Sequence, residues 1–300
     1  MSDNTLLVTG ASGHLGQRVL HHLVETLSVP ASHIIATTRQ PERLSAWAGR
    51  GVTVRAADFN IPDTLVAAAE GADRMLLVST DVLDQPGVRL VQHRAAIDAA
   101  TRAGVRHVVY TSMPDPSASL VAFAPDHAGT EAALAASGLP GWTVLRNHWY
   151  FENLFLSLPS ALATGKWYSA AGNGGIAHIA RDDLALAAAT ALVQADGKQI
   201  HTLSGAQAHT TAEIAALASA VTGKPIEVVD VPLEALVQGM VAHGLPEPVA
   251  RIFASFDANT AAGKFAEVTD DYRKLTGRAP QTLEDWLRHN GAALSAAAAG

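Results

Sequence analysis

The chain has 300 residues, 48% of them hydrophobic and 16% charged, with a formal net charge of −7 and no cysteine. This composition is ordinary for a globular enzyme of one large or two merged domains, and the negative charge disfavours nucleic acid as a partner. The lack of cysteine excludes disulfides, thiol catalysis and zinc–thiolate sites, and without a signal peptide or an apolar run of about 20 residues we expect a cytoplasmic protein with no membrane partner.

Short β-branched runs alternate with helix-length segments through the first 150 residues. We predict strands at 5–9, 33–38, 52–56, 74–80, 106–112 and 142–146, because these runs are almost continuously apolar, as strands buried on both faces are. Helices are predicted near 14–27, 41–49, 62–70, 86–103 and 127–137. The repeated strand–helix–strand order predicts an α/β fold with a Rossmann-like, doubly wound parallel sheet.

The alternation loosens after residue 146. We expect helices at 147–165, 181–195 and 210–223, strands at 198–205 and 224–231, and mostly helix beyond them. The chain therefore divides into an NAD(P)-binding Rossmann domain at 1–150 and a smaller C-terminal α/β substrate domain at 151–300. This division allows strands of the second half to join the first sheet.

A glycine-rich segment, TLLVTGASGHLG (5–16), links the first predicted strand to the first predicted helix. Glycines in such a turn let the backbone approach a pyrophosphate, and the helix N-terminus supplies amide donors. The alternative is a nucleotide fold that has lost its ligand. We expect the dinucleotide to be bound here by Gly10, Ser12, Gly13, His14, Leu15 and Gly16.

The second predicted strand ends in Thr37, Thr38 and Arg39, with Arg43 one turn later. A cofactor with a free ribose 2′-hydroxyl usually meets an acidic residue at this position, whereas a guanidinium suits the 2′-phosphate of NADP. One charge-assisted hydrogen bond contributes about 1.5–3 kcal/mol. Arg39 therefore predicts NADPH over NADH, and the alternative is a solvated surface arginine.

Polar residues also follow the next three strands. Asp58 comes where the exocyclic amine of adenine would pass, and Phe59 is placed to lie against the ring, although an ordinary turn aspartate is the alternative. Ser79, Thr80 and Thr111 end the fourth and fifth strands, at the edge where open sheets bind ligands. Small hydroxyl residues there contact ribose or nicotinamide, or merely cap helices.

The segment LRNHWYFENL (145–154) leaves the sixth strand at the same edge. Asn147 comes directly at the strand end, close to the expected nicotinamide, and Tyr150 follows about one helical turn later. We expect both in the acceptor pocket. For Trp149 and Phe151 we favour the alternative, in which aromatic side chains pack the joint between the two parts of the chain.

Five segments together carry a resemblance to a known family: TGASGHLG (9–16), TTRQPERL (37–44), RHVVYTSM (106–113), LRNHWYFENL (145–154) and IARDDLALAA (179–188). Up to about residue 290, the chain resembles the NmrA-like atypical short-chain dehydrogenases, and among them the type 2 NAD(P)H:quinone oxidoreductases and the triphenylmethane reductases. The resemblance implies a cleft between two domains and NADPH as hydride donor to quinones or conjugated dyes, without flavin. It associates Asn147 with catalysis, and the glycine loop, Arg39 and Asp58 with the cofactor.

Short-chain dehydrogenases usually serve the reacting oxygen with a Ser, a Tyr and a Lys four residues after the Tyr. Here Ser112 has the Ser position, but His127 and Glu131 stand in the Tyr and Lys positions. Because Glu131 has the wrong charge to lower a neighbour's pKa as Lys does, the usual proton relay is absent. His127 is a candidate general acid, and the alternative is a surface or structural histidine.

We therefore predict an NADPH-dependent oxidoreductase that passes hydride directly to a small-molecule quinone, dye or similar conjugated acceptor, without flavin or metal. A reduced quinone carries a phenolate-like oxygen, so the neutral amide of Asn147 suffices as hydrogen-bond donor, and Tyr150 adds a hydrogen bond or stacks on the ring. NADH is the less favoured cofactor, and a homo-oligomer is left open. Two alternatives are a non-catalytic NAD(P)-sensing regulator and a carbonyl or imine reductase with His127 or Tyr150 as acid.

Overall fold

A seven-stranded parallel sheet forms the centre of the first half of the molecule. The computed structural model describes residues 4–83 and 85–299. The strand order is β3-β2-β1-β4-β5-β6-β9, and every neighbouring pair is parallel. The strands are β1 (Leu6–Val8), β2 (Ile34–Thr38), β3 (Thr53–Ala56), β4 (Arg74–Leu77), β5 (His107–Ser112), β6 (Gly141–Asn147) and β9 (Lys198–Leu203). The predicted α/β, Rossmann-like fold is confirmed.

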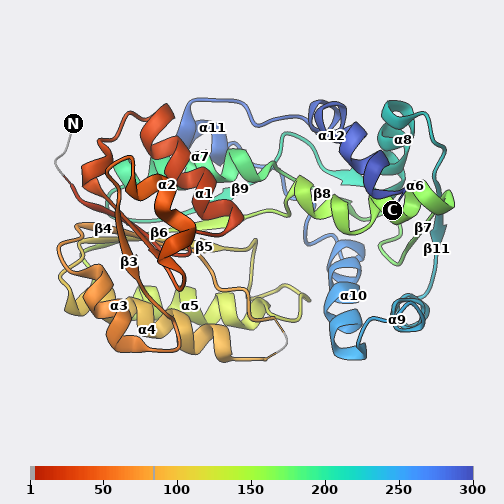
Figure 1. Ribbon diagram of the computed structural model, residues 1–300. Helices are drawn as coiled ribbons and strands as arrows, with labels where there is room; N and C mark the ends of the chain where they lie inside the picture. The colour runs from red at the N-terminus through yellow and green to blue at the C-terminus, as the bar shows by residue number, and fades with distance from the viewer. Residues whose placement is uncertain (1–3, 84, 300) are drawn as a thin grey trace.

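Two helical layers cover the sheet (Figure 1). One face carries α1 (His14–His21), continued by the π-helical turn η1 (His22–Thr26), with α7 (Arg181–Gln194) and α11 (Asp271–Thr276). The other face carries α3 (Pro62–Ala69), α4 (Val88–Arg102) and α5 (Ala124–Ala136). Successive strand residues point to opposite faces, so Leu6 and Val8 join the first core and Leu7 the second. This two-sided burial explains the continuous apolar runs of the strands.

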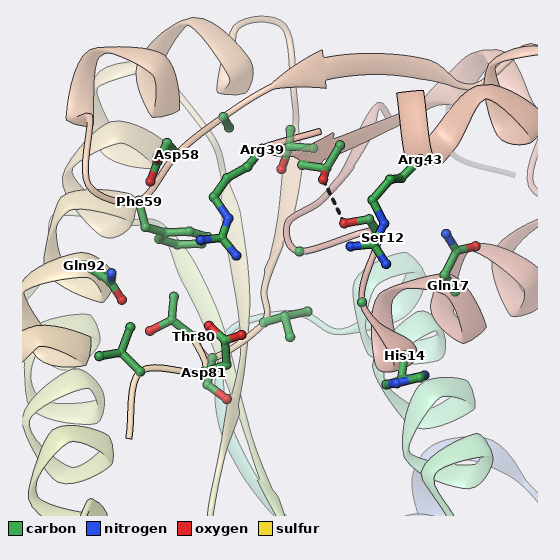
Figure 2. Close-up of a pocket in the computed structure, with 18 of the residues that line it drawn as sticks. Ser12, His14, Gln17, Arg39, Arg43, Asp58, Phe59, Thr80, Asp81 and Gln92 are labelled. Carbon is green, nitrogen blue, oxygen red and sulfur yellow. Dashed lines mark hydrogen bonds between the residues drawn. The ribbon is translucent and has the colours of Figure 1, made fainter. Parts of the chain in front are cut away.

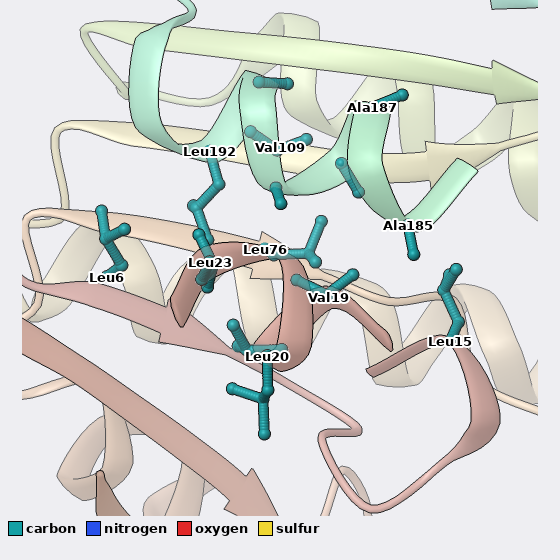
Figure 3. Packing of buried hydrophobic residues seen from close by; sticks show 14 of the residues in the cluster. Leu6, Leu15, Val19, Leu20, Leu23, Leu76, Val109, Ala185, Ala187 and Leu192 are labelled. Carbon is teal, nitrogen blue, oxygen red and sulfur yellow. The ribbon is translucent and has the colours of Figure 1, made fainter. Parts of the chain in front are cut away.

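Alanine lets α7 lie deep in the first core. Nine of its residues are buried, five of them alanines, and Figure 3 shows Ala185, Ala187 and Leu192 above Val19 and Leu23 of the α1–η1 segment. Small side chains allow the helix to approach the sheet and α1 closely. Helix α7 therefore belongs to the Rossmann core although it follows residue 150.

The rest of the C-terminal half, apart from α7, β9 and α11, lies on the right of Figure 1. It contains two two-stranded sheets, β7 with β11 and β8 with β10, and helix α8 begins with a capping box between Thr210 and Glu213. The elements are η4 (Phe151–Leu156), α6 (Leu158–Thr164), β7 (Lys166–Ser169), β8 (Gly175–Ile176), β10 (His209–Thr210), α8 (Thr211–Thr222), β11 (Glu227–Asp230), α9 (Leu233–Ala242), α10 (Glu247–Ala261) and α12 (Leu283–Ala297).

Two predicted helices differ from these elements. The helix expected at 147–165 is a 3-10 segment followed by the short α6, with Ser157 between them and Pro159 in the first turn of α6, where a proline needs no donor. The helix expected at 41–49 is a 3-10 turn, η3 (Pro41–Leu44), and a four-residue helix, α2 (Ser45–Ala48). The strand expected at 198–205 exists as β9, at the edge of the first sheet. None of the helices in the described part of the chain is both long and apolar enough to cross a bilayer.

Hydrogen bonds tie α10 to the loop between β5 and α5. The side-chain oxygen of Asn259 accepts bonds from the hydroxyl of Ser119 at 3.0 Å and the amide of Leu120 at 2.7 Å. Next to this contact the rings of Trp149 and Phe256 lie 4.2 Å apart. The two halves of the chain therefore meet beside the carboxyl ends of β5 and β6.

Candidate active site

A cavity of about 960 Å³ opens at the carboxyl edge of the sheet, above β1, β2 and β4. Figure 2 shows polar side chains reaching into it from the ends of these strands and from α1 and α4. Nine of the twelve predicted cofactor residues line it: Gly10, Ser12, Gly13, His14, Arg39, Asp58, Phe59, Ser79 and Thr80. The edge of the sheet thus gathers side chains that are far apart in sequence, as open α/β sheets do at their ligand sites.

The glycine loop forms a backbone cradle under one end of the cavity. Gly10 has a φ of +58°, and a Cβ on Gly16 would come within 2.5 Å of the Gly10 carbonyl oxygen. Gly13 precedes α1 without a side-chain cap, so the first amides of that helix face the cavity unblocked. Leu15 packs in the hydrophobic core, and Gly16 serves the close packing of helix and turn. This cradle fits a pyrophosphate.

Two guanidinium groups lie over the end of β2. Arg39 and Arg43 both extend into the cavity in Figure 2, and Arg43 lies beside Ser12. The hydroxyls of Ser12 and Thr38 are 2.7 Å apart, and the Thr38 hydroxyl accepts the amide of Gln40 at 3.1 Å. Two cations and two hydroxyls in one corner have the chemistry of a phosphate site.

The opposite wall is formed by the ends of β3 and β4 and by α4. Asp58 accepts the amide of Asn60 at 2.9 Å, and Asn60 in turn accepts the side-chain amide of Gln92 at 3.0 Å. Figure 2 shows the ring of Phe59 between Asp58 and the cavity, next to Gln92. Thr111 lies below this wall, where its hydroxyl accepts the amide of Ser79 at 2.9 Å. It supports the cavity and does not line it.

Residues from the second half close the cavity beside the glycine loop. Asp182, in the first turn of α7, contacts Arg18 at 2.5 Å and His22 at 3.0 Å. The hydrogen bonds from His22 and Arg18 hold the pKa of Asp182 well below its usual range. Glu152 accepts the backbone amide of Arg181 at 2.9 Å. Because Arg18 and Asp182 are 164 positions apart, no local pattern assigned them to the site.

His127 lies away from this cavity, in contrast to the expectation of a general acid. The side chain is 4% exposed, and Nε2 lies 3.1 Å from Arg89 while Nδ1 lies 2.8 Å from the Tyr110 hydroxyl. A guanidinium can only donate, so Nε2 is the acceptor and the single proton is on Nδ1. Burial, followed by the charge of Arg89, lowers the pKa of His127 well below its usual range. His127 is therefore a neutral, interior histidine with both nitrogens engaged.

A second interior histidine supports the cavity wall. The Nε2 atom of His93 accepts the backbone amide of Thr80 at 3.0 Å, so the proton of this ring is on Nδ1, which lies 2.9 Å from the hydroxyl of Thr130. Burial and the charge of Arg89 lower the pKa of His93 to about 3. His93 thus holds the end of β4 in place while remaining neutral.

Asn147 ends β6 and Tyr150 follows three residues later, and neither is among the residues that line the cavity. Asn147 is 6% exposed, and within the described chain neither its amide nitrogen nor its oxygen makes a hydrogen bond of normal geometry. Burial raises the pKa of Tyr150, and the neighbouring Asn147 amide and Arg181 guanidinium oppose that rise. Arg181, which lines the cavity, lies over the Tyr150 ring at 5.6 Å. Trp149 and Phe151 pack against other aromatic rings at the joint.

Metal ligation is not visible in this arrangement. Across residues 4–83 and 85–299, no three His, Asp or Glu side chains are grouped so that they could hold a metal ion. The chemistry that the site offers is therefore a phosphate-binding cradle, a cationic corner and an amide at the strand end.

The NmrA-like family model matches residues 2–287 of the chain. Quinone oxidoreductase 2 of Escherichia coli is 36% identical over 286 residues, which cover 95% of this chain and 98% of that protein. Its structure with NADPH superimposes with a TM-score of 0.89, at 35% identity and over 95% and 99% of the two chains. NAD(P)H azoreductase of Xenophilus azovorans is 30% identical, and the match covers 97% of this chain and 100% of that protein. Citrobacter triphenylmethane reductase with NADP(H) is 34% identical, with a TM-score of 0.84 over 95% and 99%.

Proposed function

Because the chain belongs to the NmrA-like family, we propose that it transfers hydride from NADPH directly to a quinone or a similarly conjugated acceptor. The relatives named for quinone, azo and triphenylmethane reduction each align over at least 95% of this chain. The proposal therefore extends to the whole molecule. It includes a cytoplasmic location, and a division of labour in which residues 1–150 bind the cofactor and 151–300 complete the acceptor side.

The cavity fits NADPH. The loop with Gly10 and Gly13 offers backbone amides at the start of α1 to a pyrophosphate, and the corner formed by Arg39, Arg43 and Ser12 fits a 2′-phosphate. Phe59 and Asp58 offer a flat ring and a carboxylate to the adenine. When bound in this way, NADPH supplies the hydride, and the protein holds donor and acceptor against each other.

The state of the protonatable groups favours a conjugated acceptor. Hydride addition to a ketone leaves an alkoxide whose conjugate acid has a pKa near that of water, about 15.7, whereas a reduced quinone resembles tyrosine, about 10. The difference of about six units corresponds to about 8 kcal/mol of proton affinity. A ketone therefore requires a strong, positioned acid. His127 is neutral and accepts a hydrogen bond from Arg89, and Glu131 forms an ion pair with Arg146, so neither is available as that acid.

The buried amide of Asn147 carries this proposal. The amide meets the Tyr150 hydroxyl without normal hydrogen-bond geometry, and a buried amide left unsatisfied costs about 1–3 kcal/mol of stability, so its retention at the end of β6 points to a ligand. We assign its N–H groups to the oxygen of the acceptor that gains negative charge as hydride arrives, in the manner of an oxyanion hole. Tyr150 adds a hydroxyl and a ring face to the same place. The proton that completes the reduced product comes from water.

A screen of NADPH oxidation tests the proposal. Purified protein is mixed with NADPH and one of four acceptor classes: quinones, dyes, imines and ketones. We expect oxidation of NADPH with quinones or dyes and only background rates with ketones. Turnover of ketones at a comparable kcat/KM would contradict it. No turnover with any class, together with similar affinities for NADP⁺ and NADPH, would favour the sensing regulator instead.

A further inference from the structure

Arg89, in the first turn of α4, is a buried arginine with free hydrogen-bond donors. The residue as a whole is only 3% exposed to solvent. One nitrogen donates to His127 at 3.1 Å. The atoms Nε and Nη1 are buried and, within the described residues, have no hydrogen-bond partner. These two atoms carry three of the five guanidinium N–H groups.

The charge of Arg89 has no contact ion pair among the residues that the structure describes. Burial lowers its pKa, and Tyr110, Asp126, Asp81 and Tyr150 oppose that effect. Besides the His127 ring, the ring of Phe123 lies close, with its centroid 4.7 Å from the guanidinium carbon. An arginine remains charged under such conditions, and a buried charge without a partner is costly. The site is therefore electrostatically incomplete.

Arg89 does not itself line the cavity, but its charge lies within electrostatic reach of Tyr150, one of the two residues proposed for the acceptor. Gln92, which lines the cavity, lies one helical turn after Arg89 on the same face of α4. Figure 2 shows Gln92 and Asp81 on this side of the cavity. On the other side of Arg89, the ring centroids of Phe123 and Phe256 are 5.9 Å apart, and those of Phe256 and Trp149 are 4.2 Å apart. Trp149 comes two residues after Asn147 in the chain. An aromatic wall thus leads from the end of β6 to Arg89.

Resting on the proposed function, we propose that Arg89 binds an anionic oxygen group carried by the acceptor, such as a sulfonate or a carboxylate. These groups have two or three oxygens, which match the three free N–H groups of a planar guanidinium. Phe123 and Trp149 offer ring faces to an aromatic acceptor. Because the guanidinium is closed to solvent, the anionic end lies innermost, and neighbouring side chains shift to admit it.

The test compares a neutral acceptor with an anionic one. Wild type, Arg89→Met and Arg89→Lys are assayed with 1,4-naphthoquinone and with 1,4-naphthoquinone-2-sulfonate at saturating NADPH. Because the sulfonate also changes the reactivity of the quinone, the measured quantity is the kcat/KM for the sulfonate divided by the kcat/KM for the neutral quinone, compared between variants. We expect Arg89→Met to lower this ratio by about ten- to a hundredfold, the range of a hydrogen bond to a charged group. Arg89→Lys, which keeps the charge but not the fork, lowers it less.

The matched control is Arg102→Met, which removes an exposed arginine from the far end of the same helix. Its ratio stays that of wild type. Equal loss of activity with both quinones in Arg89→Met and Arg89→Lys would overturn the proposal and leave Arg89 a structural residue. A lower affinity for NADPH in both variants, with an unchanged ratio, would assign Arg89 to the cofactor and also overturn it.

A binding measurement separates this inference from the proposed function. Naphthalene-2-sulfonate and 2-naphthol are titrated into protein saturated with NADP⁺, and the shift in Tm is recorded. We expect the sulfonate to raise Tm for wild type and for Arg102→Met but not for Arg89→Met. This result would stand even if no acceptor were reduced. A sulfonate shift that persists in Arg89→Met would overturn the inference while leaving quinone reduction untouched.

Discussion

The hydroxyl of Ser112 donates to the carboxylate of Glu131 across 2.6 Å. Arg146, which pairs with Ser112 across β5 and β6, binds the same carboxylate through Nε at 3.1 Å and Nη2 at 2.7 Å. The hydrogen bond to Glu131 raises the pKa of Arg146. Two of the positions that form a proton relay in other short-chain dehydrogenases are here part of a closed ion pair. Glu131 therefore supports the strand ends and does not move protons.

We expect Glu131→Gln to destabilise the fold by about 2 kcal/mol while leaving kcat within about threefold of wild type. The Glu131 and Arg146 side chains are 12% and 24% exposed, so the substitution leaves a largely buried guanidinium without its counter-charge. Urea unfolding gives the first quantity and NADPH oxidation the second. Glu284→Gln, in an ion pair with Arg288 that is more than half exposed, is the control and should change stability by less than about 0.5 kcal/mol.

Asn147→Ala should lower kcat for quinones by about 10²–10³, the loss found when one oxyanion donor is removed. Its dissociation constant for NADPH should change less than about twofold, because the proposed role of the amide is to bind the acceptor and not the cofactor. Stopped-flow measurement of single turnovers and a fluorescence titration of NADPH give the two quantities. Asn290→Ala, on the distant α12, controls for loss of an asparagine. Normal turnover by Asn147→Ala would remove this residue from the mechanism.

Arg39→Ala should reduce the preference for NADPH over NADH by about ten- to a hundredfold, and Arg43→Ala should act in the same direction. Both guanidinium groups line the corner of the cavity beside Ser12 and Thr38. The measured quantity is the ratio of kcat/KM values for the two cofactors, so NADH serves as the internal control. If both cofactors lost activity equally, the arginines would support the fold of the loop and not the 2′-phosphate.

The cofactor side of the site could be predicted because its signals are local. Gly10 to Gly16 lie within one turn, and Arg39 and Asp58 each come within two residues of a strand end. In a parallel sheet, the carboxyl ends of all strands meet at one edge, so the strand pattern alone brings these residues together. The same reasoning placed Asn147 at the end of β6, although it could not show that the amide lacks a hydrogen bond of normal geometry.

The rest depended on contacts between distant segments. The position of His127 along the chain suggested a catalytic slot, but Arg89 and Tyr110, 38 and 17 positions away, occupy its two nitrogens. Asp182 reaches the cavity only because the alanine-rich α7 packs against α1, which brings it to Arg18. Hydrophobic periodicity shows that a helix has a buried face, but it does not show which helix that face will meet.

Buried neutral histidines should make the fold sensitive to acid. His148 is fully buried, both of its ring nitrogens are without a hydrogen-bond partner in the described residues, and burial lowers its pKa to about 4. An unfolded histidine titrates near 6.5, so between pH 6.5 and about 4 the unfolded state binds the proton and the folded state does not. Stability is therefore complete above pH 6.5 and falls as the pH decreases through this window.

At pH 5, His148 alone costs about 2 kcal/mol, since 1.5 units at 1.36 kcal/mol per unit separate that pH from 6.5. His148→Leu should be neutral or stabilising at pH 7.5, because it removes two unpartnered polar atoms, and it should gain about 2 kcal/mol on wild type between pH 7.5 and 5.0. Urea unfolding at the two pH values measures both quantities. His243→Leu, at an exposed position, should follow the wild-type curve. Parallel curves for His148→Leu and wild type would show that His148 is not neutral in the folded protein.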